Sequence, residues 1–297
     1  MSAEPSAPVV VEKKGPPSIR RRVLRSSLLL LAILVLALGV LLFFEESFIY
    51  FPEKYPAGFW QPEAFRLPAE DVWFEASDGT ALHGWFAPAK DPAGTILYSH
   101  GNGGNLTYLA DVAHDWVERG WSVFLYDYRG YGRSAGVPGE AGLYLDAQAA
   151  WDATIRQEEV DPERIVLIGQ SLGGAVATEL ALRSQPRALV LESTFTRVAD
   201  MASRVVPLPG IGHLVRTKFE TIDKIARVGV PLLVAHGNRD TMIPFDMGRR
   251  VYEAAKEPKR FVEVERADHN DLHVVGGRTY LDQVEAFLDE ALRGPSK

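Results

Sequence analysis

The alternation of hydrophobic and polar positions divides the chain into one long apolar run and a body of mixed pattern. Residues 28–44 carry no charge, and Ser26 and Ser27 extend this uncharged run to 26–44. From about residue 70, short apolar runs alternate with segments whose apolar residues recur at helical spacing. The pattern therefore predicts a long helix near the N-terminus, followed by an α/β domain over 70–293.

The short apolar runs of this domain predict its strands. Two strands form an antiparallel pair within 71–89, around the turn signal Ser77-Asp78-Gly79. Further strands are expected at 94–101, 121–132, 164–169, 187–193, 231–237 and 260–265, and helices at 142–157, 172–184 and 279–293. Apolar strands separated by helices are typical of a mostly parallel sheet that is covered on both faces.

Residues 194–229 do not follow this alternation. They lie between two predicted strands, exceed the usual length of such a connection, and contain the helix-breaking stretch Pro207-Leu208-Pro209-Gly210. We interpret this segment as a short lid over a site.

The apolar run 26–44 is long enough to cross a membrane. At a rise of about 1.5 Å per residue, a helix of this length spans roughly the 30 Å hydrocarbon core of a bilayer. Arginines precede it and Glu45-Glu46 follow it, which favours a cytoplasmic N-terminus and places the domain over 70–293 on the extracytoplasmic side. A cleaved signal peptide and a buried core helix are the alternatives. The first usually has a shorter apolar region that ends at a small-residue cleavage site, and the second would show polar positions at helical period.

These observations divide the chain into four parts. The parts are a basic tail (1–25), a transmembrane helix or signal-anchor (26–44), a juxtamembrane linker (45–69) and the domain with its lid (70–293). The basic tail is rich in proline and basic residues and is expected to be disordered. Tyr50, Phe51 and Tyr55 in the linker suit either a membrane-interface belt or the first packing of the domain.

Charge and composition exclude several classes of function. The net charge is −7, and residues 1–27 contribute six basic and two acidic side chains, so the remainder carries −11. An acidic body is a poor partner for nucleic acid. The absence of cysteine from the sequence excludes thiol catalysis, disulfides and cysteine-ligated zinc. We found no sequence pattern for a metal cluster or a phosphate-binding loop, and we expect no cofactor.

Two serines satisfy the G-x-S-x-G pattern of a nucleophile elbow. Ser171 lies in Gly169–Gly173, between a predicted strand and a predicted helix, which is the context that this motif requires. Ser134 lies in Gly132–Gly136, and Pro138 and further glycines follow it, so a loop is expected there. Context therefore favours Ser171 as the nucleophile.

A serine hydroxyl needs a base and a group that orients the base, and in this motif both follow the serine in the chain. His269 lies in a loop between the last predicted strand and the last predicted helix, and it is the favoured base, with His273 as the alternative. Asp240 follows a strand end and is the favoured acid. Glu192, after the preceding strand, is the alternative acid.

The remaining histidines are assigned other places. His236 ends a strand and is expected to shape the following turn, and His213 lies in the predicted lid. His100 precedes the nucleophile and is expected to have a structural role.

The oxyanion hole needs two backbone N–H donors. The first is expected from Leu172, directly after the nucleophile, and the second from the glycine-rich loop 99–105, with Asn102 as the favoured residue.

Five motifs, "SHGNGGN", "DYRGYGRS", "GQSLGGA", "HGNRDTMIP" and "DHND", in this order, resemble the α/β-hydrolase superfamily. More closely, the chain is similar to its single-pass membrane-anchored members, over about residues 70–293. The resemblance implies an eight-stranded sheet with Ser171, Asp240 and His269 as the catalytic triad. Relatives include esterases, acyl-protein thioesterases and peptidases, and several carry arginine where this chain has Gln170.

These features lead to one main functional hypothesis and two alternatives. The main one is a membrane-anchored serine hydrolase that cleaves carboxylic esters or thioesters of a small or acylated substrate through an acyl-enzyme intermediate. A peptidase with the same three residues would need charged groups such as Arg204, Arg216 or Lys218 in the lid. A non-catalytic membrane scaffold would have little reason to keep all three groups.

Overall fold

The computed structural model describes residues 19–206 and 208–294. The chain separates into two compact units, Met1–Phe44 and Glu45–Lys297. Within the first unit, helix α1 runs from Ile19 to Phe43 and is long and apolar enough to cross a membrane. It begins seven residues before the predicted span 26–44, because the preceding arginines are good helix formers and continue the helix without being apolar. The expected disorder of the tail up to residue 18 lies outside the described residues.

The body is built on an eight-stranded sheet with the order β10-β9-β8-β7-β4-β6-β3-β2. The pairs β2·β3 and β3·β6 are antiparallel and the other pairs are parallel. The strands are β2 (Glu70–Glu75), β3 (Ala81–Ala87), β4 (Gly94–Ser99), β6 (Trp121–Tyr126), β7 (Ile165–Gln170), β8 (Leu189–Glu192), β9 (Leu232–Gly237) and β10 (Lys259–Val264). The predicted mostly parallel α/β sheet, with an antiparallel pair at its start, is confirmed.

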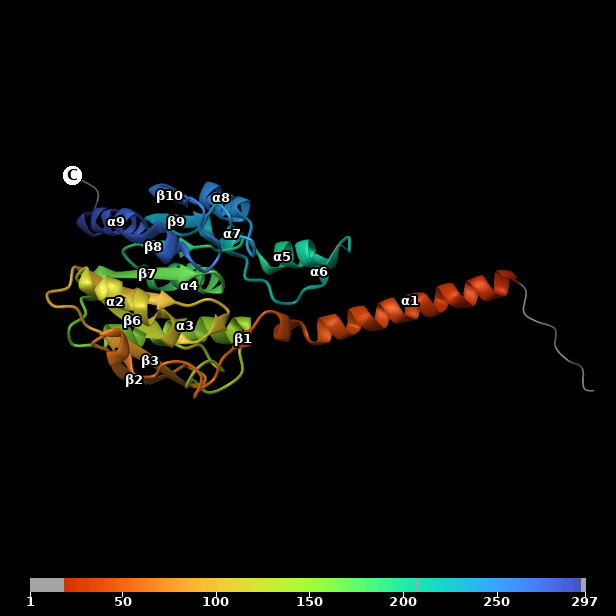
Figure 1. Cartoon of the computed structure of the whole chain (residues 1–297), viewed down its shortest axis with the longest axis horizontal. Helices are drawn as coiled ribbons and strands as arrows, with labels where there is room; N and C mark the ends of the chain where they lie inside the picture. Colours follow the sequence, from red (N-terminus) through yellow and green to blue (C-terminus); the bar gives the residue numbers. More distant parts are fainter. Residues whose placement is uncertain (1–18, 207, 295–297) are drawn as a thin grey trace, which may run out of the picture. The chain divides into compact units, whose positions relative to one another are not determined.

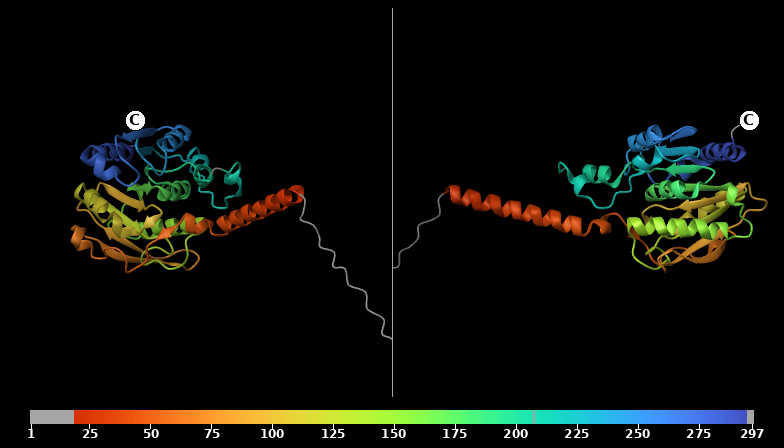
Figure 2. Two further views of the ribbon diagram at one scale, coloured as in Figure 1. Left: turned by 45° about the vertical axis from the view of Figure 1, so that its right-hand side comes forward. Right: turned by 180° about the vertical axis from the view of Figure 1, so that it is seen from behind.

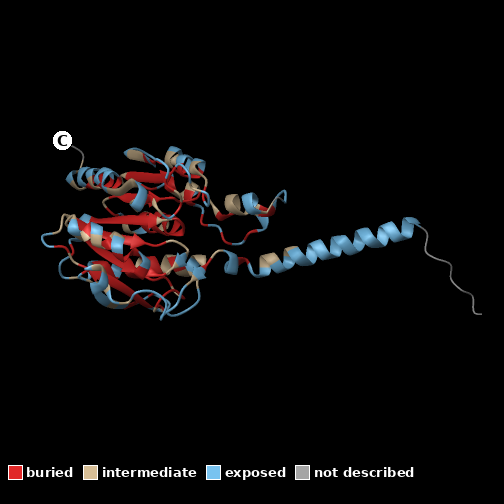
Figure 3. Cartoon of the chain, in the orientation of Figure 1, coloured by how far each residue is buried: buried red, intermediate tan, exposed pale blue. Residues whose placement is uncertain are grey.

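Helices cover both faces of the sheet, and the views from the front and from behind show the two faces in turn (Figures 1 and 2). One face packs against α3 (Glu140–Ile155), α4 (Leu172–Ser184), α7 (Thr221–Ile225) and α8 (Phe245–Ala254). The other face packs against α2 (Ala110–Glu118) and α9 (Leu272–Arg293). The central strands are buried throughout (Figure 3). Each large apolar side chain buried there stabilises the fold by about 1.5–3 kcal/mol.

Residues 45–69, expected to be a linker, have defined structure and contacts within the body. They contain two short 3-10 helices, Glu45–Phe48 and Pro62–Phe65, and the two-residue strand β1 (Phe51–Pro52). Strand β1 pairs in parallel with β5 (Gly103–Gly104) in a small second sheet. Tyr50 and Leu67 are buried in the body. The aromatic residues of this segment therefore include a core member, Tyr50, beside exposed Phe51 and Tyr55.

The described residues of the irregular segment 194–229 form three short helices. They are α5 (Val198–Val205), α6 (Ile211–Leu214) and α7. The α7 helix packs on α4 and α8 in the body, whereas α5 and α6 pack mainly on each other.

Candidate active site

Ser171 occupies a sharp turn between β7 and α4. Its backbone angles, φ 54° and ψ −117°, are rare for any residue with a side chain and mark a strained elbow. The flanking glycines make the turn possible, since a Cβ on Gly173 would overlap the carbonyl oxygen of Ser99, and one on Gly169 would overlap the carbonyl oxygen of Gly173. The Ser171 N–H donates to the carbonyl of Glu192 at 2.8 Å, which ties the elbow to β8.

The structure brings together the three residues that the sequence singled out. The Nε2 atom of His269 lies 3.0 Å from Ser171 Oγ, and its Nδ1 atom lies 2.9 Å from Asp240 Oδ2. Because Nδ1 faces a carboxylate, the proton of the neutral ring belongs on Nδ1, and Nε2 is left to accept the serine proton. Ser171 and His269 are 6% and 4% exposed, so the pair is shielded from bulk water.

Asp240 is held by four donors. Its Oδ1 atom accepts from the N–H groups of Met242 (2.9 Å) and Ile243 (2.7 Å). Its Oδ2 atom accepts from His269, and it also lies 3.2 Å from Nε2 of His236. Burial acts to raise the pKa of Asp240, but the hydrogen bonds from His236 and His269 outweigh it and hold this pKa well below its usual range. The carboxylate therefore stays ionised and fixes the orientation of the His269 ring.

The two expected oxyanion donors lie beside the elbow. The N–H of Leu172 is the first of helix α4, and neither it nor the N–H of Asn102 has an acceptor within the described part of the chain. A Cβ on Gly101 would lie 3.7 Å from Cβ of Ser171, so the backbone of loop 99–105 passes directly against Ser171. The Asn102 side chain points to the carbonyl of Ile49, at 2.9 Å.

The alternative catalytic residues are engaged elsewhere. The hydroxyl of Ser134 donates to the carbonyl of Asp127 (2.8 Å) and accepts from the N–H of His83 (3.0 Å). The Nδ1 atom of His100 lies 2.7 Å from the Gly101 carbonyl. His213 is exposed on α6. Of the two candidate serines, only Ser171 therefore has its hydroxyl beside a histidine ring that is paired with a carboxylate.

Glu192 and His273 form a second cluster, in which Glu192 is buried and His273 is partly buried. The carboxylate of Glu192 accepts from the hydroxyls of Tyr98 and Tyr280, each at 2.5 Å, and from Nε2 of His273 at 3.1 Å. Burial acts to raise the pKa of Glu192, yet the charge and hydrogen bond of His273 lower it overall. Burial acts to lower the pKa of His273, yet Glu192 raises it overall. Both shifts favour the same state, a Glu192 carboxylate paired with a protonated His273.

This ion pair predicts a pH-dependent stability. The depressed pKa of Glu192 adds stability above its unfolded pKa of about 4.3, and the raised pKa of His273 adds stability that is lost as pH rises through its folded value. The H273Q variant keeps a neutral donor but loses the charge, at a cost of about 2 kcal/mol. At pH values between roughly 5 and 6.5, we expect H273Q to melt about 4–8 °C below the wild type. Above pH 8 the difference in melting temperature between the two proteins should be smaller.

Thermal melts of the wild type and H273Q at several pH values would measure this effect, with the exposed His213→Gln variant as the matched control. A difference between wild type and H273Q that stays the same from pH 5 to pH 9 would contradict the ion pair.

A cavity of about 640 Å³ opens at Ser171. It is lined by residues of the glycine-rich loop 99–105, which is called the oxyanion loop below after its predicted role. Gln170, His269 and residues of the 45–69 segment and of helices α2 and α9 also line it. Phe51, Tyr108, Met242 and Val274 contribute to it and are each more than half exposed. Its rim therefore carries exposed apolar side chains beside the exposed carboxylates of Glu53 and Asp111, while its floor carries the polar groups of the elbow.

The predicted lid does not contribute to this cavity. None of the described residues in 194–229 lines it, whereas Phe51 and Glu53 of the 45–69 segment do.

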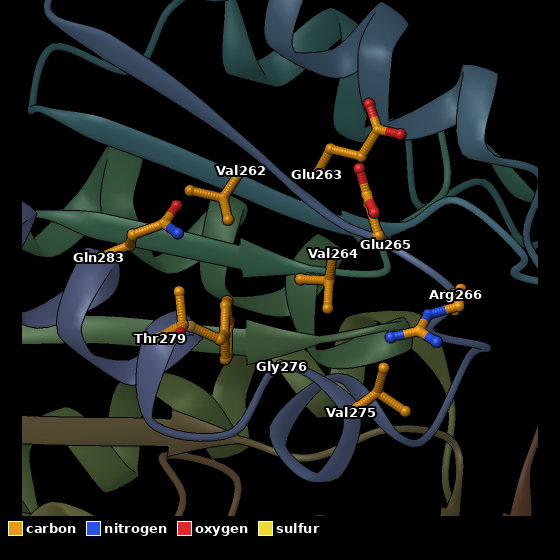
Figure 4. Close-up of a pocket in the computed structure, with 10 residues that line it drawn as sticks. Val262, Glu263, Val264, Glu265, Arg266, Val275, Gly276, Thr279 and Gln283 are labelled. Atoms are coloured by element: carbon orange, nitrogen blue, oxygen red, sulfur yellow. The ribbon is translucent and has the colours of Figure 1, made fainter.

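A smaller cavity of about 250 Å³ lies between β10 and the first turns of α9 (Figure 4). Glu263, Glu265 and Arg266 line this cavity, and none of Ser171, His269 and Asp240 is among its described lining residues.

Within residues 19–206 and 208–294, no three metal-ligating side chains lie close enough to hold an ion.

Sequence reasoning missed two contributors to the site. His236 was expected to shape a turn, and it does donate toward the Ile243 carbonyl at 2.9 Å, but it also contacts Asp240. The i,i+4 spacing of His236 and Asp240 across a tight turn is a signal that could have revealed this contact. The second contributor is residues 45–53, whose contacts with the oxyanion loop have no signal in the sequence pattern.

Comparison with known proteins gives a consistent result. Residues 90–222 match the family described as "Serine aminopeptidase, S33". The chain is 40% identical to an uncharacterized protein of Mycobacterium tuberculosis, over 86% of this chain and 92% of that protein. It is 33% identical to the alpha/beta hydrolase domain-containing protein WAV2 of Arabidopsis thaliana, over 87% and 92%. It is 31% identical to protein bem46 of Schizosaccharomyces pombe, over 88% and 91%.

Solved structures share the fold. The esterase Pf2001 of Pyrococcus furiosus superposes with a TM-score of 0.68 at 21% identity, covering 81% of this chain and 97% of that structure. The hydrolase GrgF of a Penicillium species superposes with a TM-score of 0.62 at 22% identity, covering 76% and 100%. At these identities the likeness concerns the fold.

Proposed function

Because the chain belongs to the α/β-hydrolase family, we propose that it is a serine hydrolase that cleaves carboxylic esters or thioesters. The observation that carries the proposal is the continuous set of hydrogen bonds from Ser171 through His269 to Asp240, at 3.0 and 2.9 Å, at the floor of an open cavity. A Ser–His–Asp set with this geometry is the arrangement that activates a hydroxyl for acyl transfer.

The first half of the reaction forms an acyl-enzyme. Ser171 Oγ attacks the acyl carbon while its proton passes to Nε2 of His269, and the carbonyl oxygen becomes an oxyanion. The N–H groups of Leu172 and Asn102 hydrogen-bond this oxyanion. When the tetrahedral intermediate collapses, the bond to the leaving oxygen or sulfur breaks, and His269 gives that atom its proton.

The second half repeats these steps with water. His269 removes a proton from water, the resulting hydroxide attacks the acyl carbon, and Ser171 leaves with the proton that His269 returns. Asp240 remains ionised and stabilises the imidazolium in both halves. Each oxyanion donor contributes about 2.7–4 kcal/mol to lowering the barrier, by comparison with other enzymes.

The rim of the cavity supports a hydrocarbon acyl chain. Tyr108, Met242 and Val274 surround the opening and are each more than half exposed, so an acyl chain lying on them would remove apolar surface from water. Each buried methylene adds about 0.8 kcal/mol to binding. We therefore propose that longer acyl chains bind more tightly than acetate.

An aminopeptidase is the second candidate. The description of the matching family favours it, and so do Glu53 and Asp111, two carboxylates that line the cavity and could pair with a substrate ammonium group. The described residues that line the cavity include no lysine or arginine. This lining supports recognition of an amine rather than a carboxylate, and it gives no role to Arg204, Arg216 or Lys218 of the lid.

Hydrolysis of two substrate series would separate the candidates. For an esterase we expect p-nitrophenyl esters to be cleaved, with kcat/KM rising at least about tenfold from the acetate to the octanoate, because burial of only two of the six added methylenes on the apolar part of the rim corresponds to about 1.6 kcal/mol. For an aminopeptidase we expect aminoacyl-p-nitroanilides to be the better substrates. Preference for the anilides would overturn the ester proposal, and cleavage of neither series would count against both.

We further propose that α1 anchors the protein as a single span, with the N-terminus in the cytoplasm and the catalytic body outside. The apolar length of Ile19–Phe43 and the arginines at its start support this orientation. A topology reporter inserted after residue 48 should be active only on the extracytoplasmic side. Activity on the cytoplasmic side would contradict the orientation.

A further inference from the structure

We propose that residues 45–53, here called the strap, position the oxyanion loop and hold it in its working conformation. The strap is the first part of the body in the chain, directly after the unit that ends at Phe44. The inference rests on the proposed function, in which the N–H of Asn102 is an oxyanion donor. It adds to that function a positioning element that lies more than a hundred residues before the nucleophile.

Asn102 is bonded to the strap on two sides. Its side-chain Nδ2 donates to the carbonyl of Ile49 at 2.9 Å, and its own carbonyl accepts from the N–H of Phe51 at 3.0 Å. Strand β1 then pairs with β5, and the N–H of Glu53 donates to the carbonyl of Gly104 at 3.1 Å. The loop residue that carries the donor is therefore fixed by the strap through its side chain and through the peptide that follows it.

The loop needs such support because of its composition. Gly101, Gly103 and Gly104 surround Asn102, and glycine loses more conformational freedom on ordering than any other residue. The peptide that contains the Asn102 N–H also contains the Gly101 carbonyl, which lies 2.7 Å from Nδ1 of His100. His100 therefore holds this peptide from one side, and the strap holds the next peptide from the other.

The strap is itself attached to the body at both ends. At its start, the buried carboxylate of Glu45 accepts from the N–H groups of Arg216 (3.0 Å) and Thr217 (2.7 Å). At its end, the carbonyl of Glu53 accepts from the N–H of Gly132 at 2.9 Å, and its carboxylate accepts from the hydroxyl of Tyr108 at 2.6 Å. A segment held at both ends can transmit a defined position to the loop between them.

Two substitutions at one position isolate the strap's hydrogen bond. In the full-length chain, Phe51→Pro removes the N–H that donates to Asn102, whereas Phe51→Ala removes the ring but keeps the N–H. We expect kcat for p-nitrophenyl acetate to be about ten- to a hundredfold lower in F51P than in F51A, with KM within about twofold. Loss of a complete oxyanion donor, about 10²–10³-fold, sets the upper bound. Melting temperatures of both variants check that each one folds.

A double-mutant cycle connects the effect to the loop. Asn102→Ala removes the bond to Ile49 and leaves the backbone N–H, and we expect it to lower kcat. If the strap acts through Asn102, the losses from F51P and N102A should not add in the double variant. If F51P does not fold, N102A alone decides: a kcat equal to that of the wild type overturns the inference.

The outcomes also distinguish this inference from the proposed function. Equal kcat values for F51P and F51A, in an active enzyme, would show that the strap only lines the cavity. A wild-type protein that hydrolyses neither the esters nor the anilides would instead count against the proposed function.

Discussion

Replacement of Ser171 by alanine is expected to lower kcat by about 10⁵- to 10⁶-fold and to abolish labelling by a fluorophosphonate probe. The probe forms a covalent bond to an activated serine oxygen, and Ser171 Oγ is the hydroxyl that lies 3.0 Å from His269 Nε2. Losses of this size follow removal of the nucleophile in other serine hydrolases, where the remaining rate comes from the oxyanion hole and from binding. Activity-based labelling and ester hydrolysis would measure the two effects independently.

Ser134 provides a matched control, because it satisfies the same five-residue pattern. Its hydroxyl bonds to backbone groups of His83 and Asp127, so Ser134→Ala should reduce stability, by about 1–3 kcal/mol, while the protein still takes up the probe. If S134A lost the label and S171A kept it, the assignment of the nucleophile would be reversed.

Replacement of Asp240 by asparagine is expected to lower kcat by about 10⁴-fold with little change in KM. An asparagine oxygen could keep the bonds from Met242 and Ile243, and the amide nitrogen would then occupy the place of Oδ2. A donor at that place favours the His269 tautomer with the proton on Nε2, which cannot accept the proton of Ser171.

Asp246→Asn serves as the control for this substitution. It makes the same chemical change at an exposed position six residues later, in the first turn of α8, and it should leave the rate unchanged. Steady-state kinetics over a pH range would measure both variants. A D240N enzyme within tenfold of the wild type would show that Asp240 does not orient the base.

The sequence was sufficient to predict the strands along the chain and a mostly parallel sheet, because buried strands have strong apolar runs. It did not predict the order of the strands within the sheet. It did not predict α2 and α8, which are short and contain many polar residues. Helix α8 also contains Gly248, a poor helix former, which lies where any larger side chain would meet the ring of His236. A tertiary contact, rather than helix propensity, accounts for that residue.

The members of the site could be predicted to different extents. Ser171, Asp240 and His269 each follow a strand, and the carboxyl ends of parallel strands meet at one edge of a sheet, so their chain order was informative. The contact of His236 with Asp240 depends on the path of one turn. The lining of the cavity by the 45–69 segment instead of by 194–229 depends on packing between distant parts of the chain, which pattern and spacing do not encode.

The bonds between the strap and the oxyanion loop have a consequence for how this region can vary. Most of them use main-chain atoms of the strap: the Ile49 carbonyl, the Phe51 N–H and the Glu53 N–H. Exchanges of side chain at Ile49 or Phe51 would leave these atoms in place. Insertion or deletion of a single residue between positions 45 and 53 would move every partner by one step. The region should therefore accept many substitutions but a single length, a constraint that residue-by-residue identity does not reveal.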